Sequence, residues 1–499
     1  MLTLYDPDRS QSTRRYGTPT SWEAFQMAIT GLLEELRTTR GEGFRLLMGA
    51  FTSPTLEAQC RTLLARYPKA RIHTHEPGGR DQVHAGCQMA FGRPAQPVYH
   101  LNQATRILAL DADFLVDEPG SVRYARDFAA GRRPGEGQHE PNRLFVAECT
   151  PSVTGVQADH RVLLKSGAME ALARAVLAGI QGSGEAAPPA GIPAPWLQAV
   201  VADLKGAGAH GLVIAGSQQS AVVHALTGAI NSALGSIGTT VTYTAPVEVL
   251  FGNPGDSLKE LVQDIGAGKV KTLVILGCNP AYSAPADLQM AEALQRVPLR
   301  IHMGLYDDET ASLCHWHVPQ THYLESWSDI RAYDGTASLV QPLIEPLYEC
   351  HSPHELLALL TGVGPRPPYE LVREHWMRMW GMAVPGPAAG PAGSPMRADS
   401  GPRLVPSDAF ESRWHEALNK GVIAGTAARA FAGLAARVPP VSAPAAAGPE
   451  LLFRLDPTIR AGQFANNGWL QELPKCFTAL TWDNALLLSP ADLRSRNLT

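Results

Sequence analysis

The residues "AHGLVIAGSQQSAVVHALTGAINSAL" at 209–234 set the fold class of this sequence. A short apolar run leads into a tight polar turn and then into a longer run of helix-forming residues. The stretch "VKTLVILGCNPAYSAPADLQMAEALQRV" at 270–297 repeats that plan. Strands that alternate with helices of this length predict parallel sheets with both faces covered by helices.

The same alternation extends in both directions along the chain. Short apolar runs typical of buried strands stand at 43–51, 104–115, 142–149 and 298–308, and the run "ATRILALDADFL" at 104–115 ends in acidic residues. The runs at 43–51 and 104–115 are each followed by a longer stretch with helical periodicity. We therefore expect an α/β protein with two doubly wound parallel-sheet units.

Three stretches rich in proline, glycine, alanine and serine interrupt the alternation and predict surface loops or linkers. At 499 residues the chain is also too long for one core. We expect a first α/β unit at 1–180, a linker at 181–195, a second unit with its exit segment at 196–380, a linker at 381–408, a helical segment with a Pro/Ala-rich linker at 409–450, and the start of a truncated C-terminal domain at 451–499.

Composition argues against several classes of protein. A formal net charge of −5 gives no basic field, so a nucleic-acid partner is not expected. No apolar run is long enough to predict a membrane span, and the start "MLTLYDPDRSQSTRRYG" contains no export signal. The closest two of the seven cysteines, Cys60 and Cys87, are 27 residues apart. Without a CxxC-like pair we expect no iron–sulfur cluster and no zinc site.

Two strand–helix turns are candidates for binding phosphate. Gly216, Ser217 and Gln218 follow the first apolar run quoted above, and Asn279 and Pro280 follow the second. Ligands of α/β sheets bind outside the carboxyl ends of strands, so both turns could face one cleft. Neither turn contains a GxGxxG or a GxxxxGK[ST] motif, and ordinary connections remain the simpler interpretation.

Two clusters of polar residues could be taken for a metal site and a catalytic triad, but the spacing of their residues supports neither. His315, His317, His322 and Glu325 could be taken for metal ligands, but no HExxH motif is present and Pro319 interrupts any helix. A strand edge followed by a loop explains them better. A second cluster, Glu148, Cys149, Asp159, His160 and Arg161, could suggest a Cys–His–Asp triad, but nothing places the nucleophile beside its base. Asp159, His160 and Arg161 before an apolar run fit a local ion-pair network better.

The order of elements and several motifs resemble the molybdopterin oxidoreductase superfamily. The resemblance extends over nearly all of the chain outside the low-complexity breaks, and five stretches carry it. They are "LYDPDRSQSTRRYGTPTSWEAFQMAI" at 4–29, "CTPSVTGVQADHRVLLKSGAMEALA" at 149–173, "LVILGCNPAYSAPADLQMAEAL" at 273–294, "GLYDDETASLCHWHVPQTHYLESWSD" at 304–329 and "NNGWLQELPKCFTALTWDNALLLSP" at 466–490.

Within that superfamily the chain is most similar to the molybdopterin-like iron–sulfur subunit of alternative complex III, a quinol-oxidising membrane complex. The stretches 106–132 and 323–348 and the motif "NNGWLQELP" carry this narrower resemblance. Active relatives place a metal-ligating residue shortly before an "FG" segment. In "HEPGGRDQVHAGCQMAFGRP", Gly78 and Gly79 occupy about that place, and Cys87 lies too close to Phe91 to replace it.

The resemblance implies a non-catalytic module that scaffolds an iron–sulfur module carried by another chain or by a further part of a longer polypeptide. No catalytic, cofactor-binding or metal-ligating residue is expected, and whether the chain alone is an enzyme stays open. The implied partners are the iron–sulfur module, haem c subunits and integral membrane subunits, on the periplasmic side of the cytoplasmic membrane.

Two other interpretations stay open. One is an active molybdopterin-dependent oxidoreductase chain, in which Gly216, Ser217, Gln218, Asn279 and Pro280 would bind the pyrophosphates of the cofactor. The other is an unrelated nucleotide-binding α/β protein.

Overall fold

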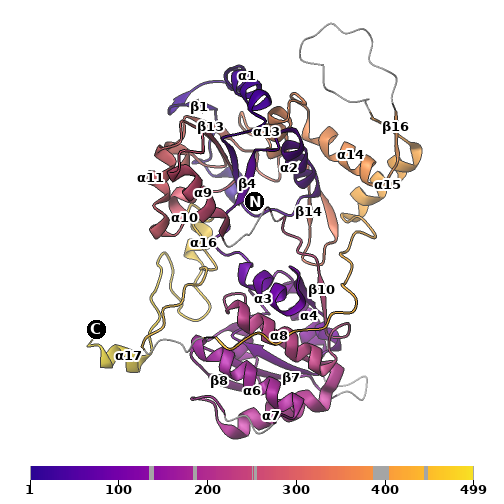
Figure 1. Ribbon diagram of the computed structural model, residues 1–499, viewed down its shortest axis with the longest axis vertical. Coiled ribbons are helices and arrows are strands. Elements are labelled where there is room, and N and C mark those ends of the chain that lie inside the picture. The colour runs from indigo at the N-terminus through magenta and orange to yellow at the C-terminus, as the bar shows by residue number, and fades with distance from the viewer. Residues whose placement is uncertain are drawn as a thin grey trace.

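The computed structural model describes residues 2–133, 140–183, 188–249, 251, 256–385, 404–442 and 448–497. Figure 1 shows two lobes, one above the other, each built on a sheet with helices packed against it. Within the described ranges no helix has the length and apolar character needed to cross a membrane. The expected α/β class with parallel sheets is confirmed.

The upper lobe contains a seven-stranded sheet in the order β2-β1-β13-β12-β11-β3-β4. The strands from β13 to β4 are parallel, and β1 runs antiparallel to β13 at one edge. The strands are β1 (Arg14–Arg15), β2 (Thr18–Pro19), β3 (Phe44–Met48), β4 (Arg71–Thr74), β11 (Thr272–Leu276), β12 (Leu299–Gly304) and β13 (Trp316–Pro319).

The lower lobe contains a four-stranded, fully parallel sheet in the order β8-β7-β6-β9. A two-stranded antiparallel ribbon, β5 with β10, accompanies it. The strands are β5 (Gln96–Tyr99), β6 (Arg106–Leu110), β7 (Arg143–Glu148), β8 (His160–Leu163), β9 (Gly211–Ala215) and β10 (Val241–Thr244).

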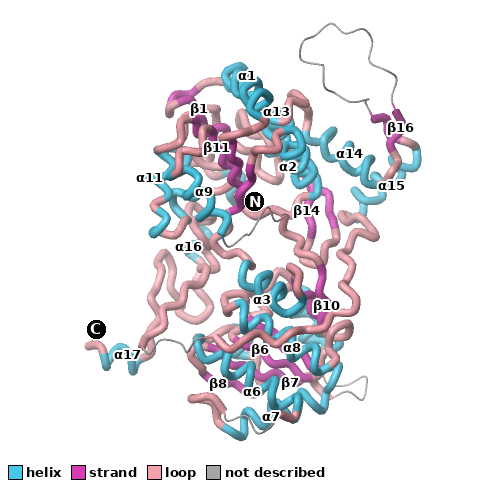
Figure 2. Tube along the Cα trace, in the orientation of Figure 1, coloured by secondary structure: helices cyan, strands magenta, loops and turns pink. Residues whose placement is uncertain are grey.

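Helices cover both faces of each sheet, as a doubly wound fold requires (Figure 2). In β11, Val274 and Leu276 join a core with α1, α2 and α13, whereas Leu273 and Ile275 join a core with α9 and α11 on the other face. The helices of the two lobes are α1 (Trp22–Thr39), α2 (Pro54–Arg66), α3 (Asp81–Phe91), α4 (Ser121–Ala130), α6 (Met169–Gln181), α7 (Ala194–Ala207), α8 (Ala221–Leu234), α9 (Ser257–Gly266), α11 (Met290–Gln295) and α13 (Pro353–Leu360).

The expected division of the chain into units at 1–180 and 196–380 is wrong. The upper sheet takes β1 to β4 from the start of the chain and β11 to β13 from the second half, while the lower sheet consists of β6 to β9. The expected linker at 181–195 falls inside the lower lobe, between α6 and α7, and its residues 184–187 lie outside the described residues. The chain leaves the upper sheet after β4, completes the lower lobe, and returns.

Helix α3 is the connection between the lobes. It follows β4 of the upper sheet in sequence, yet it packs on α8 of the lower lobe (Figure 1). A Cβ at Gly86 of α3 would lie 2.4 Å from the Cβ of His224 in α8, so this crossing requires glycine. The N–H of Ala221 at the start of α8 also donates to Oε1 of Gln82 at 3.0 Å. The loop 75–80 therefore lies between the two sheets.

A smaller aromatic unit follows the upper sheet. It contains the hairpin β14 (Ser328–Arg331) and β15 (Ala337–Val340), with α14 (Pro368–Met379) and α15 (Asp408–Lys420). Trp376, Phe410 and Trp414 are buried in its core. Of the expected linker 381–408, residues 386–403 lie outside the described residues, and Ala383–Pro385 pairs with Leu404–Pro406 as strands β16 and β17.

After α15 the chain runs down along the lower lobe as an extended strap (Figure 1). The N–H of Phe431 donates to the Tyr243 carbonyl at 2.8 Å, and the N–H of Arg437 donates to the Ala90 carbonyl at 2.9 Å. The carbonyl groups of Pro439 and Pro440, in the Pro/Ala-rich linker expected within 409–450, accept hydrogen bonds from Arg174. Residues 443–447 of that linker lie outside the described residues. Beyond it, 451–497 contain only the short helices α16 (Gly468–Glu472) and α17 (Pro490–Ser495).

The N-terminal segment is held to the upper lobe by a buried ion pair. Arg9 of the "PDR" motif pairs with Glu325 at 2.7 Å, and neither side chain is exposed. Arg9 also donates to the Leu4 carbonyl at 2.7 Å, while Glu325 accepts the N–H groups of His322 and Leu347. Because both charges are paired and hydrogen-bonded, their burial is tolerated. The loss of one partner would leave the other charge buried and unpaired, which destabilises the fold.

We expect Arg9→Met to lower the free energy of unfolding by about 3–5 kcal/mol, because Glu325 would remain buried without its cation. Urea unfolding followed by tryptophan fluorescence would measure this loss. The double variant Arg9→Met/Glu325→Leu should recover a large part of the lost stability, since it leaves no buried charge without a partner.

The matched control is Lys69→Met, which breaks the exposed Lys69–Glu42 pair and should cost less than about 1 kcal/mol. Equal losses for Arg9→Met and Lys69→Met would contradict a structural role for the buried pair.

Candidate functional site

The carboxyl ends of the lower-sheet strands bring several polar side chains together. Asp111 follows β6, Cys149 follows β7, and the turn Gly216–Gln219 follows β9. Ligand sites of α/β sheets lie outside such strand ends. This is the place where the sequence suggested Gly216, Ser217 and Gln218 as phosphate-binding residues.

Asp111 is the centre of this site. It adopts a left-handed backbone conformation (φ 52°) that non-glycine residues rarely adopt, and its carboxylate is buried. Oδ1 accepts the N–H of Cys149 at 3.1 Å, and Oδ2 accepts amide N–H groups of Gln218 at 3.0 Å and Gln219 at 2.9 Å. A sequence signal for this residue existed, because the run 104–115 ends in acidic residues.

Gly216 allows this approach. A Cβ at that position would lie 2.0 Å from the Asp111 carbonyl oxygen, so only glycine fits. Gln218 then donates to the same carbonyl at 2.6 Å. The turn is therefore fitted to Asp111 rather than left open, and its side chains are engaged in protein contacts.

The cation that pairs with Asp111 comes from the far end of the chain. Nη2 of Arg454 lies 2.8 Å from Oδ1 and 2.8 Å from Oδ2 of Asp111, and 3.2 Å from Sγ of Cys149. Arg454 lies 343 residues from Asp111 in sequence, and sequence reasoning missed it. No local pattern could have indicated this contact.

Cys149 is not organised as a nucleophile. Burial, followed by the charge of Asp111, raises the pKa of its thiol, so the reactive thiolate is disfavoured. The other members of the imagined triad bond elsewhere: Asp159 pairs with Arg132 at 2.5 Å, and His160 stacks on Phe145. Arg161 pairs with Glu148. Asp159 and Arg161 thus form ion pairs, as predicted, whereas His160 takes part in a ring stack instead.

The loop 75–80 lies between this site and the upper sheet. A Cβ at Gly78 would come 2.1 Å from Cδ1 of Leu455, so an apolar side chain covers Gly78, which lies about where the family resemblance would place a metal ligand. Arg80 of the same loop pairs with Glu118 at 2.8 Å, and both side chains are nearly buried. We call the space between the lower-sheet strand ends and Gly78 the crevice. Arg454 and Leu455 occupy it.

The second candidate turn lies on the other sheet. Asn279 donates to Glu309 at 2.7 Å and accepts from Thr310 at 2.7 Å, which ties the turn to α12 (Glu309–Ser312). Pro280 begins the short helix α10 (Pro280–Ser283). Among the described residues no hydrogen bond joins this turn to Gly216–Gln219.

Several groups at the lower-sheet strand ends already bond within the protein, which disfavours a cofactor with pyrophosphate groups there. Phosphates need free N–H groups or cations, but the N–H of Gly216 donates to the Leu110 carbonyl and that of Gln219 donates to the Gly216 carbonyl. The strand ends also carry five acidic side chains, Asp111, Asp113, Asp117, Glu118 and Glu148. Three of them are neutralised by arginines of this chain, Asp111 by Arg454, Glu118 by Arg80 and Glu148 by Arg161. In the described ranges no three His, Cys, Asp or Glu side chains are placed to hold a metal.

The four residues considered as metal ligands in the stretch 314–348 make separate contacts. His317 Nδ1 lies 3.0 Å from His302 Nδ1, and its Nε2 lies 2.6 Å from Ser10 Oγ. His322 contacts Thr3, and Glu325 pairs with Arg9. His315 lies beside Arg300. The polar groups are therefore satisfied by protein contacts, as expected, but the partners come from the N-terminal segment and β12 rather than from neighbours in sequence.

We expect Arg454→Gln to release the C-terminal segment from the crevice. A hydrogen bond to a charged group contributes about 1.5–3 kcal/mol, so chymotryptic cleavage near Phe453 should accelerate about tenfold or more. Time courses followed by mass spectrometry would measure this. Arg460→Gln, which changes an exposed arginine of the same segment, should leave the rate nearly unchanged, and an unaltered rate for Arg454→Gln would contradict the anchoring role.

Acid should destabilise the upper lobe through the pair His302 and His317. Burial lowers the pKa of His302 to about 4, and burial and the neighbouring His302 lower that of His317 to about 3. Because both values lie below the unfolded value of about 6.5, the unfolded chain binds more protons as the pH falls. Each histidine should then reduce stability by about 1.4 kcal/mol per pH unit below about pH 6.5.

We expect His317→Asn to flatten this dependence by about 1.4 kcal/mol per pH unit between about pH 6.5 and pH 5. Urea unfolding at a series of pH values measures the slope. His415→Asn, at an exposed position on α15, should leave the slope unchanged.

No family model matches this chain. The menaquinone reductase molybdopterin-binding-like subunit of Nitratidesulfovibrio vulgaris is 26% identical over 326 residues, which cover 57% of this chain and 47% of that protein. The NADPH-Fe(3+) oxidoreductase subunit alpha of Geobacter sulfurreducens is 29% identical over 107 residues, or 21% of this chain and 12% of that protein. The chain thus spans less than half of either relative.

Among solved structures, acetylene hydratase from Pelobacter acetylenicus superposes with a TM-score of 0.57 at 13% identity. The match covers 76% of this chain and 66% of that structure. At this identity the likeness concerns the fold alone.

Proposed function

Because the chain is a molybdopterin-oxidoreductase-like protein, we propose that it is a non-catalytic module of a quinol-oxidising electron-transfer complex. Its sequence similarity to a menaquinone reductase molybdopterin-binding-like subunit supports this assignment. The narrower resemblance to the iron–sulfur subunit of alternative complex III favours the same kind of complex. In this role the chain holds an iron–sulfur module, supplied elsewhere, against the other subunits.

The observation that carries the proposal is the occupation of the crevice by the protein itself. Arg454 neutralises Asp111, and Leu455 packs on Gly78. A molybdopterin cofactor would have to displace both side chains and then lie against an edge rich in carboxylates. A fold of this type without its redox centre retains a structural role, since fold alone does not determine chemistry.

The surface of the C-terminal segment suits a protein assembled with partners. Large apolar side chains are exposed along 451–488, at Leu451, Phe453, Trp469, Trp482 and Leu486, among others. Figure 1 shows this segment at the side of both lobes, next to the space between them. Contiguous exposed apolar surface is typical of protein–protein contacts. We propose that the iron–sulfur module, the haem c subunits and the integral membrane subunits assemble with this chain on the periplasmic side of the membrane.

An active molybdopterin-dependent chain is the second candidate. The close approach of Gly216 to Asp111 and the strained backbone of Asp111 are features of a ligand-binding strand end. In that case the segment around Arg454 would leave the crevice before Gly216, Ser217, Gln218, Asn279 and Pro280 could receive the cofactor.

We expect the purified chain to contain neither molybdenum nor iron above background. Elemental analysis by mass spectrometry, together with oxidative extraction and fluorescence detection of pterin, distinguishes the two candidates. Stoichiometric molybdenum or a pterin signal would overturn the proposal. The Arg454→Gln variant should be measured in parallel, because a pterin signal in that variant alone would favour the second candidate.

A further inference from the structure

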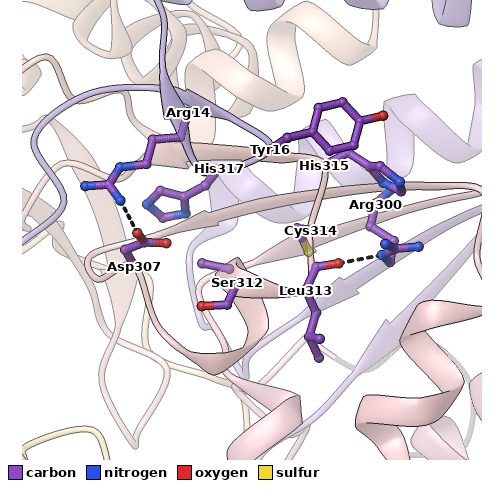
Figure 3. A pocket seen from close by; sticks show the side chains of 11 residues that line it. Arg14, Tyr16, Arg300, Asp307, Ser312, Leu313, Cys314, His315 and His317 are labelled. Atoms are coloured by element: carbon purple, nitrogen blue, oxygen red, sulfur yellow. Dashed lines mark hydrogen bonds and ion pairs between the residues drawn. The ribbon is translucent and has the colours of Figure 1, made fainter.

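A pocket remote from the crevice lies at the β1–β13 edge of the upper sheet (Figure 3). Its volume is about 410 Å³, which is within the range of small-molecule sites. Arg14 comes from β1, Arg300 from β12, and His315 from the residue before β13. Asp307 and Tyr16 complete the polar part of the lining.

Arg300 brings an uncompensated positive charge to this pocket. Its Nε donates to the Leu313 carbonyl at 2.6 Å, and Nη1 donates to the Val297 carbonyl at 2.5 Å. Carbonyls orient the guanidinium but carry no net charge. Within the described part of the chain, no carboxylate lies within ion-pair distance of Arg300. The N–H groups of this guanidinium that donate to no carbonyl are thus available for an anion.

His315 adds a donor beside Arg300. Its Nδ1 accepts the backbone N–H of Arg300 at 3.0 Å, and because an N–H can only donate, Nδ1 carries no proton. Burial and the charge of Arg300 lower the pKa of His315, so the ring is neutral near pH 7 and its proton resides on Nε2. The edge-to-face contact with Tyr16, at 5.2 Å between ring centroids, fixes the ring.

The other charged groups of the pocket cancel each other. Arg14 forms an ion pair with Asp307 on the side opposite Arg300 (Figure 3). Nε of Arg14 is buried and has no hydrogen-bond partner in the described structure. The lining therefore contains two guanidinium groups against one carboxylate, which leaves a net positive charge.

We propose that this pocket binds a small oxyanion, a carboxylate or phosphate group of a small molecule, between Arg300 and His315. Planar guanidinium donors match the geometry of both groups. A metal cation is disfavoured by the net charge of the lining. The site is independent of the crevice and of the proposed role in an electron-transfer complex.

Isothermal titration of the full chain with inorganic phosphate, and separately with succinate, tests this site. We expect saturable binding in the millimolar range for at least one of the two anions. Arg300→Gln removes the charge and should weaken binding about tenfold or more. His315→Asn keeps an acceptor for the Arg300 N–H but removes the donor at Nε2, so it provides a second, milder variant if Arg300→Gln fails to fold.

The matched control is Arg296→Gln, which removes an equal charge from an exposed position near the pocket and should leave the affinity unchanged. Binding of phosphate alone identifies phosphate as the ligand group, and binding of succinate alone identifies a carboxylate. If neither anion binds, or if His315→Asn and Arg300→Gln bind as tightly as the unaltered chain, the proposal is wrong.

Discussion

A buried carboxylate at the end of β6 must be neutralised, and the way in which this protein meets that requirement shapes the rest of the molecule. Asp111 lies at the carboxyl edge of the lower sheet, where its oxygens receive an N–H group, two glutamine amides and Arg454. A buried charge without a partner costs several kcal/mol. The pairing with Arg454 therefore anchors the C-terminal segment across the crevice and brings Leu455 onto Gly78.

This anchoring connects the fold to the proposed role. Here the chain fills the space between the strand ends and Gly78 with its own side chains, Arg454 and Leu455. Loop 75–80 also contacts groups of this chain: Gly78 lies under the Leu455 side chain, and Arg80 is paired with Glu118. What remains is a two-lobed body with exposed apolar groups along its C-terminal segment, which suits a partner in an assembly better than a redox centre.

The N-terminal segment has an equivalent role in the upper lobe. Arg9 and Ser10 bond to Glu325 and His317, so residues at the two ends of a span of more than three hundred residues form one polar cluster. In the stretch 314–348, His317, His322 and Glu325 make these contacts with the N-terminal segment. Because the histidines are buried and neutral, the same packing that secures the segment makes the lobe sensitive to acid.

Local patterns in the sequence were enough to establish the kinds of element and the fold class. Apolar runs such as Thr272–Leu276 are typical of strands buried on both faces, and Ser21 before the periodic residues of α1 marks a helix start, where it caps the N–H of Ala24. The lack of a metal-binding spacing in 314–348 was also evident from local pattern, as was the acidic end of β6. These features depend on residues close together along the chain.

Which strands share a sheet and what fills the crevice became evident only from the packing of the whole chain. β3 pairs with β11 across more than two hundred residues, so the division of the chain into halves by its proline-rich breaks was wrong. Arg454 meets Asp111, and Leu455 meets Gly78, because the strap after α15 carries them past the lower lobe. Such contacts join residues far apart in sequence, and no periodicity or spacing encodes them.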